Sequence, residues 1–284
     1  MAAQGHHQDP MALRGWRKVT VYGLLVVGAV VMVFPFVWSL FSSFKPPAEI
    51  LTLQPQLLPT HPTLDNYVAV LDSAGFGRWY ANSLWVAFVT TASVCIFSSL
   101  AGYSLAKFRY AGRTVIFLGI LSTMMIPAEM LVIPWFIGAS HFGLENSYLG
   151  IMFPGLISAF GVFLMKQFME AIPDSLLESA RIDGASELKI FVRIALPLVR
   201  PALASLAIFT FVSNWDAFLW PLIITTDNEM FTLPVGLQSF GSSQEINYHL
   251  IIAAANLVVL PVLAVFIVMQ RQIIEGIALT GTKG

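Results

Sequence analysis

Six long apolar stretches constrain the fold of this chain more than any other feature of its sequence. A helix needs about 20 apolar residues to cross the ~30 Å hydrocarbon core of a bilayer, and a span must be helical because lipid offers no partner to a free backbone group. With 57% of its 284 residues hydrophobic and 11% charged, the chain is excluded from the soluble class. The sequence therefore predicts an all-α, polytopic membrane protein with six transmembrane helices, at residues 19–41, 83–106, 114–138, 148–165, 201–224 and 250–269.

The basic residues indicate how the chain is oriented in the membrane. Lysine and arginine collect in the cytoplasmic loops of membrane proteins. Of the 15 lysines and arginines, all but Lys45 and Arg78 fall in the two tails, in the loop after the second span or at residues 166–200. Both termini are therefore predicted to be cytoplasmic.

The spans and loops predict an order of parts along the chain. Within the loop after the first span, Thr63 is expected to cap a short interfacial helix. The first apolar stretch is too long for a signal peptide and no small-residue cleavage site follows it, so we expect it to be retained. The predicted parts are an N-terminal tail (1–18), a first transmembrane helix (19–41), an extracytoplasmic segment (42–82), a core domain with five transmembrane helices (83–270) and a C-terminal tail (271–284).

A polar segment at residues 168–200 separates the fourth and fifth apolar stretches and predicts two short cytoplasmic helices. Pro173 and Asp174 suit a first helical turn, Gly184 suits a left-handed helix end, and Ser186 suits the cap of the second helix. An amphipathic helix lying on the membrane surface is the alternative for such an element. In the second helix, apolar residues recur at helical spacing at Leu188, Phe191, Val192 and Ala195.

One pattern within this segment resembles a family signature. Glu178-Ser-Ala-Arg-Ile-Asp-Gly184 is followed by nine residues and then by Ile194-Ala-Leu-Pro197. This spacing resembles the signature loop of the permeases of ATP-binding-cassette (ABC) importers. The resemblance implies that residues 168–200 dock onto a cytoplasmic ATPase and couple its motion to transport. The coupling residues that it implies are Glu178, Ser179, Ala180, Asp183, Gly184, Ile194, Leu196 and Pro197.

The resemblance covers nearly all of the chain from about Val19. The segments at residues 82–84, 103–109 and 276–284, and the prolines Pro127 and Pro134, are similar to those of carbohydrate permeases, specifically the six-helix partner of the maltose-type pair. The chain thus resembles a binding-protein-dependent transport system inner membrane component, and the resemblance implies the type I ABC importer permease fold.

The same resemblance implies a set of partners. These are a second homologous permease, two ABC ATPase subunits, an extracytoplasmic solute-binding protein and a sugar, in a bacterial plasma (inner) membrane, with no nucleic acid. The chain lacks the G-x-x-x-x-G-K-[ST] loop that cradles phosphates. We therefore expect a non-catalytic subunit without a cofactor of its own, with ATP and magnesium held by the ATPase. Scattered histidines without ligand spacing predict no metal site.

Polar residues in the fifth span predict a translocation path. Relatives commonly carry Trp-Asn-acidic-Phe here, whereas this chain reads Trp215-Asp216-Ala217, with Asp216 at the usual Asn position. A carboxylate within a span costs about 2.5–3.5 kcal/mol on insertion scales, so it should face a polar cavity or a partner. Hydrogen bonds between helices are the alternative for the polar residues, and packing is the alternative for the aromatic ones. The predicted path residues are Asn214, Trp215, Asp216 and Phe218.

Two alternatives to a sugar importer remain open. The cargo of an importer could instead be a glycerol phosphate or a polyamine, which the sequence discriminates weakly. A proton-coupled secondary carrier would bind protons at Asp216 and at Glu129, which lies between two prolines of the third span. The carrier leaves the signature loop unexplained.

Overall fold

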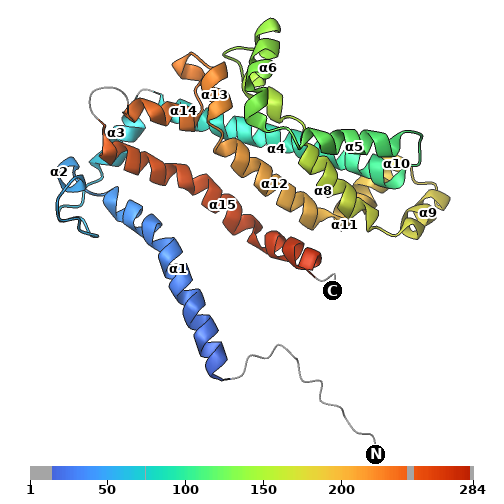
Figure 1. Ribbon diagram of the computed structural model, residues 1–284, viewed down its shortest axis with the longest axis horizontal. Coiled ribbons are helices and arrows are strands. Elements are labelled where there is room, and N and C mark those ends of the chain that lie inside the picture. The colour runs from blue at the N-terminus through green and yellow to red at the C-terminus, as the bar shows by residue number, and fades with distance from the viewer. Residues whose placement is uncertain (1–14, 74, 242–245, 282–284) are drawn as a thin grey trace, which may run out of the picture. The chain divides into compact units, whose positions relative to one another are not determined.

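The computed structural model describes residues 15–73, 75–241 and 246–281 (Figure 1). Every regular element in these ranges is a helix, which confirms the predicted all-α class. The chain forms two compact units. One comprises Met1–Val68 and Asn247–Asn256, and the other comprises Ala69–Ile246 and Leu257–Gly284.

The smaller unit contains the first transmembrane helix and the segment that follows it. Helix α1 (Trp16–Ser42) contains the predicted span and is almost entirely exposed, as suits a helix that meets lipid or another subunit. Two short helices follow, α2 (Pro47–Ile50) and α3 (Asp65–Asp72). The hydroxyl of Thr63 accepts a hydrogen bond from the backbone N–H of Asp65, the first residue of α3, at 3.0 Å, so it stabilises the start of this helix from two residues ahead of it.

Side-chain hydrogen bonds hold the segment after α1 in place. The buried Asn66 amide donates to the carbonyl oxygens of Ser43 and Lys45, at 2.9 and 2.8 Å. The Tyr67 hydroxyl lies 2.6 Å from the Ser43 hydroxyl. The Glu49 carboxylate accepts from the backbone N–H groups of residues 60 and 61. This segment is therefore an ordered structure despite its many prolines.

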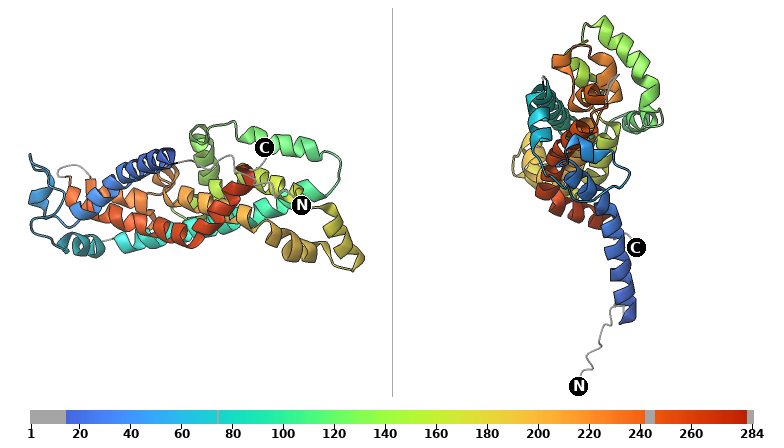
Figure 2. Two further views of the ribbon diagram at one scale, coloured as in Figure 1. Left: turned by 90° about the horizontal axis from the view of Figure 1, so that it is seen from below. Right: turned by 90° about the vertical axis from the view of Figure 1, so that its left-hand side faces the viewer.

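The larger unit is built around α4 (Phe76–Lys107), an unbroken helix of 32 residues. It packs against α8 (Ala159–Glu170) and α12 (Arg200–Trp215), which lie beside it in both figures (Figures 1 and 2). Close approach of α4 and α8 depends on Gly102, where an added Cβ would lie 2.8 Å from the Lys166 backbone nitrogen. At about 1.5 Å per residue, α4 is long enough to cross a bilayer and to extend beyond it.

Three of the six predicted spans are not continuous helices. α5 (Arg113–Thr123) and α6 (Ala128–His141) meet at 99° and divide the third span. α7 (Tyr148–Met152), a 3-10 turn (Phe153–Gly155) and α8 divide the fourth, with a bend of 50°. The fifth breaks between α12 and α13 (Leu219–Ile224). A proline lies at or near each break (Pro127, Pro154 and Pro221) and lacks the N–H that a continuous helix requires.

Element boundaries differ from the predicted parts at two places. α4 begins at Phe76, so residues 76–82 of the predicted extracytoplasmic segment are already helical. α15 (Tyr248–Gly281) runs from the sixth span into the predicted tail at 271–284. Most of the predicted N-terminal tail, residues 1–14, lies outside the described residues. The loop after α13 contains a 3-10 turn, η3 (Asn228–Met230), α14 (Leu233–Leu237) and a second 3-10 turn, η4 (Gln238–Gly241).

Candidate functional site

The signature segment folds as a hairpin of short helices, here called the coupling hairpin (residues 174–198). It consists of α9 (Asp174–Ile182), a turn, α10 (Glu187–Ile190), a π-helical segment (Phe191–Ala195) and α11 (Leu196–Leu198). The two predicted short helices are thus confirmed. Pro173 takes the cap position before α9 rather than the first helical position.

The turn of the coupling hairpin is a Schellman motif centred on Gly184. Gly184 has a φ of +79°, as predicted for a left-handed helix end. Its N–H donates to the Arg181 carbonyl, and the Ala185 N–H donates to the Ala180 carbonyl, both at 3.0 Å. The Ser186 hydroxyl then caps α10 by accepting from the Lys189 N–H at 3.4 Å. Local sequence therefore determines the bend of the hairpin.

The predicted coupling residues divide between two faces of the hairpin. One group is exposed on α9 and the turn, and the other is half-buried against the core of the larger unit. An exposed group is available to a partner, whereas the half-buried group anchors the hairpin. The exposed residues are Glu178, Ser179, Asp183 and Gly184, and the half-buried ones are Ala180, Ile194, Leu196 and Pro197.

The predicted apolar stripe on the second helix is partly wrong. Phe191 and Ala195 are buried in the core, but Leu188 and Val192 are 67% and 50% exposed. The π-helical segment changes the angular spacing of the side chains, so the four residues do not share one face. Leu188, Val192 and Ile182, which is 86% exposed, give the hairpin an apolar surface that the stripe did not predict.

Two polar links attach the coupling hairpin to the last turns of α4. Lys107 Nζ donates to the Ile172 carbonyl oxygen at 2.6 Å and lies 2.7 Å from Asp174 Oδ1. The Tyr103 hydroxyl donates to Glu187 Oε2 at 3.3 Å, and Arg181 Nε donates to Glu187 Oε1 at 2.6 Å. None of these residues was among the predicted site residues. The only signal in the sequence is the i, i+4 spacing of Tyr103 and Lys107, which places both on one face of a helix.

Neighbouring charges and hydrogen bonds shift the pKa values of two ionisable groups in the hairpin. The hydrogen bond and the positive charge of Lys107 lower the pKa of the Asp174 carboxyl below its ordinary value, and Arg109 and Arg181 add to the effect. The hydrogen bond to Glu187 raises the pKa of the Arg181 guanidinium. Both effects favour the charged forms and so strengthen the links.

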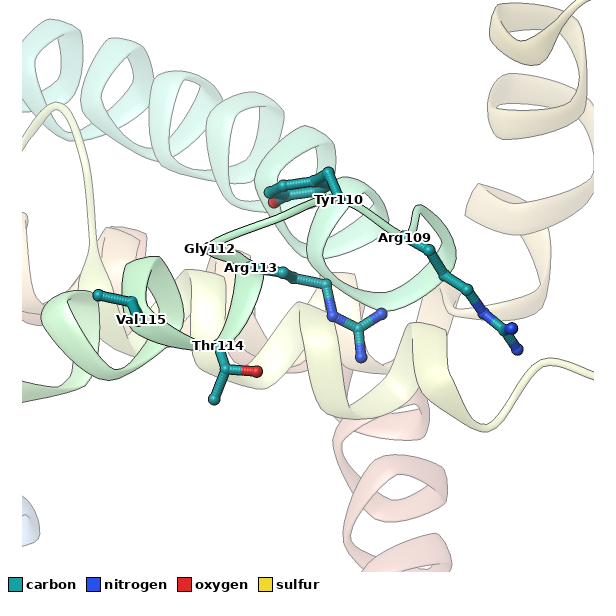
Figure 3. A pocket seen from close by; sticks show the side chains of 6 residues that line it. All are labelled: Arg109, Tyr110, Gly112, Arg113, Thr114 and Val115. Atoms are coloured by element: carbon teal, nitrogen blue, oxygen red, sulfur yellow. The ribbon is translucent and has the colours of Figure 1, made fainter.

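A basic hollow of about 260 Å³ lies in the α4–α5 loop (Figure 3). Figure 3 shows the guanidinium groups of Arg109 and Arg113 on the same side of the loop, with Tyr110 above them. Arg113 is held by a hydrogen bond from Nη1 to the Phe108 carbonyl oxygen at 3.2 Å. This loop belongs to the predicted cytoplasmic side, and its charge reaches Asp174 of the hairpin.

The predicted path residues differ in their surroundings. Trp215 is fully buried, stacks on Phe211 at 6.1 Å and donates its N–H to the Val258 carbonyl oxygen at 3.1 Å, so it packs in the core. Asp216 and Phe218 are exposed at the break between α12 and α13. Asn214 is half-buried, and its amide nitrogen donates to the Thr210 carbonyl oxygen at 2.8 Å.

A pocket of about 430 Å³ brings together residues at the ends of the broken helices. Thr123 and Met124 come from the α5–α6 break, Ile157 and Ser158 from the break before α8, and Asn214 from the last turn of α12. Non-helical backbone at membrane depth is tolerated only where it is buried in protein or lines a water-filled cavity. None of the lining residues is charged. The polar ones are Thr123, Ser158, Thr210, Ser213 and Asn214.

Comparisons with a family model and with known proteins all match this chain to membrane components of transport systems. Residues 96–278 match the family model described as binding-protein-dependent transport system inner membrane component. The chain is 36% identical over 268 residues to the arabinooligosaccharides transport system permease protein AraQ of Halalkalibacterium halodurans, covering 92% of this chain and 96% of that protein. It is 32% identical over 262 residues to the sn-glycerol-3-phosphate transport system permease protein UgpE of Yersinia enterocolitica, covering 89% and 93%.

The fold is similar to that of a solved transporter. A chain in the crystal structure of a bacterial ABC transporter involved in the import of the acidic polysaccharide alginate matches with a TM-score of 0.82 and 27% identity. The match covers 92% of this chain and 99% of that one.

Proposed function

The chain belongs to the family of binding-protein-dependent transport system inner membrane components, and from this premise we propose that it is one of two permease subunits of an ATP-driven carbohydrate importer. It is embedded in the membrane by its apolar helices. The observation that carries the proposal is the coupling hairpin, whose half-buried face is anchored and whose exposed face is free for a moving partner.

The exposed face of the hairpin suits an ATPase groove. Glu178 and Asp183 offer negative charge, Ser179 and Gly184 allow close approach, and the apolar side chains of Ile182 and Leu188 supply buried area on docking. ATP and magnesium would be held by the ATPase, and this subunit would bind neither. Closure of two ATPase subunits would then displace the hairpin and switch the bundle between inward-facing and outward-facing states. Both termini would be cytoplasmic, on the side of the hairpin.

Carbohydrate is the cargo that best fits the pocket of about 430 Å³. Hydroxyl and amide groups suit sugar hydroxyls, and Phe160 and Phe209 offer apolar contact. A glycerol phosphate would favour basic residues in the lining and a polyamine would favour acidic ones, but the described lining is uncharged. In this account Asn214 lines the translocation path. Asp216 and Phe218 would contact the path or the second permease from the neighbouring break.

The proton-coupled carrier has less support than the importer. Glu129 lies in the first turn of α6 beside the α5–α6 break, and Asp216 caps α12. Both are exposed, and neither forms an ion pair within the described part of the chain. A carrier would have no use for the exposed face of the coupling hairpin.

Purification from native membranes tests the proposal. The tagged full-length chain would be isolated in mild detergent, and its partners would be identified by mass spectrometry. We expect a second permease, an ABC ATPase and an extracytoplasmic solute-binding protein. Calorimetry of that binding protein with oligosaccharides, monosaccharides, glycerol 3-phosphate and spermidine then identifies the cargo. A chain that is recovered alone, or a binding protein that prefers glycerol 3-phosphate or spermidine, would contradict the proposal.

A further inference from the structure

One face of α4, at its cytoplasmic end, contacts both limbs of the coupling hairpin. Lys107 meets the start of α9 through Asp174 and the Ile172 carbonyl, and Tyr103, one turn earlier, meets the start of α10 through Glu187. Arg181 closes the hairpin on itself, because it reaches from α9 to the same Glu187 carboxylate. The hairpin is therefore attached at two points to a single helix.

The α4 side chain of each attachment is sheltered from water, whereas the carboxylates of Asp174 and Glu187 are exposed to solvent. Tyr103 is 4% exposed, and its ring contacts Phe191 of the hairpin and Phe108 of the following loop, with centroids 5.2 and 5.7 Å apart. The Lys107 side chain is also 4% exposed. A buried donor has few alternative positions, so each hydrogen bond is directional although solvent reaches its acceptor. The buried positions of Tyr103 and Lys107 therefore set where the two limbs of the hairpin begin.

The opposite end of α4 holds the loop between the fifth and sixth spans. Trp79 Nε1 donates to the Asn228 carbonyl oxygen at 2.9 Å, and the buried Asn82 amide donates to the carbonyl oxygens of Glu229 and Phe231 at 2.8 and 2.9 Å. Ser83 Oγ accepts from the Leu233 N–H at 2.7 Å. Residues 228–233 are here called the outer segment. The coupling hairpin and the outer segment are thus attached to opposite ends of one helix.

We propose that Tyr103 and Lys107 are positioning residues that fix the coupling hairpin to α4, so that displacement of the hairpin moves α4 and the outer segment together. The inference rests on the proposed function, since it requires that an ATPase displaces the hairpin. α4 suits this role because it is unbroken, whereas the third and fourth spans bend at 99° and 50°. An unbroken helix transmits an axial or lateral displacement, and a broken one absorbs part of it at the break.

Conservative variants in the complete transporter test the inference. Tyr103→Phe removes only the hydroxyl and keeps the ring contacts, Lys107→Met removes the ammonium group, and Lys107→Arg restores a donor. Two matched controls remove similar groups elsewhere. Tyr67→Phe removes a hydroxyl that bonds to Ser43, and Lys166→Met removes an ion pair with Glu170 inside α8.

The measurements are made on transporter reconstituted in liposomes with its ATPase and binding protein. We expect Tyr103→Phe and Lys107→Met to retain the ATPase and to hydrolyse ATP, but to import about three- to tenfold less sugar per ATP. Lys107→Arg should recover part of this loss, and the controls should keep the wild-type ratio. In the wild type, trapping the ATP-bound state should also change hydrogen exchange in the outer segment. The variants should lose that change, which a general loss of stability would not cause.

A wild-type ratio of sugar to ATP in Tyr103→Phe and Lys107→Met would overturn the inference. So would an equal fall in the two controls. Failure of the proposed function gives a different result, because the unaltered chain would then retain no ATPase. Tyr103→Phe is the mildest change. If Lys107→Met does not assemble, the ratio of imported sugar to hydrolysed ATP in Tyr103→Phe alone tests the inference.

Discussion

Lys107 Nζ lies 2.7 Å from Asp174 Oδ1, which joins the last residue of α4 to the first residue of α9. The lysine side chain is buried, whereas the aspartate side chain is 68% exposed. The pair therefore combines a fixed donor with an acceptor that solvent reaches freely. Its contribution to stability is small for that reason, and its main effect is to set where the hairpin begins.

This pair predicts a pH dependence with a definite sign. The hydrogen bond from Lys107 lowers the pKa of the Asp174 carboxyl in the folded chain below 3.8, the ordinary value. A lowered pKa stabilises the fold above the unfolded pKa, and this contribution is lost as the pH falls through the folded pKa. The difference in melting temperature between the wild type and Asp174→Asn should therefore be constant above about pH 5 and should shrink below it. A difference that does not vary down to about pH 3 would contradict the assignment.

The approach of α4 to α8 predicts a second effect. Gly102→Ala should lower the free energy of unfolding by about 1–3 kcal/mol, because its Cβ would meet the Met165 and Lys166 backbone, which cannot move aside easily. The control is Gly119→Ala in α5, where nothing lies within 4 Å of the added carbon. That change should be neutral or stabilise the helix by up to about 1 kcal/mol. Thermal unfolding in detergent measures both. Equal melting temperatures for the two variants would show that the close approach has no energetic role.

The pocket at the helix breaks predicts an effect on transport without an effect on assembly. Asn214→Ala removes an amide from the lining, so uptake at low sugar concentration should fall by about tenfold. Ser205→Ala on the same helix is the control, because its hydroxyl bonds to the Pro201 carbonyl oxygen outside the pocket. The measurement is uptake of labelled sugar into cells, normalised to the amount of complex, for Asn214→Ala and Ser205→Ala. Unchanged uptake in Asn214→Ala would remove this residue from the path.

Sequence reasoning succeeded where local chemistry decides the structure. Apolar length predicts the helical class, and Gly184 predicts the bend of the hairpin because a left-handed turn favours glycine whatever surrounds it. The same turn leaves Asp183 and Gly184 of the signature loop exposed. The 99° bend of the third span lies at Pro127, a residue that lacks the N–H of a continuous helix.

Sequence reasoning failed where distant contacts decide the outcome. Tyr103 and Glu187 are 84 positions apart, so no local pattern could pair them. Trp215 was predicted to line the path, yet it is buried beside Tyr80 of α4 and bonds to Val258 of α15, both far from it in the sequence. The π-helical segment likewise shifts Leu188 and Val192 away from the face that simple helical spacing assigns to them.

The central claim is that the hairpin couples this subunit to an ATPase. ATP-dependent uptake by a Gly184→Arg variant tests this claim most directly. The matched control is Gly112→Arg, because Gly112 has a φ of +83° close to that of Gly184, and both have open space around them. Each variant thus has the same backbone strain and a new arginine, and only one carries it on the docking face. We expect Gly184→Arg to insert in the membrane, to lose the co-purifying ATPase and to abolish uptake, while Gly112→Arg retains both. Normal uptake by Gly184→Arg, with the ATPase still bound, would contradict the account.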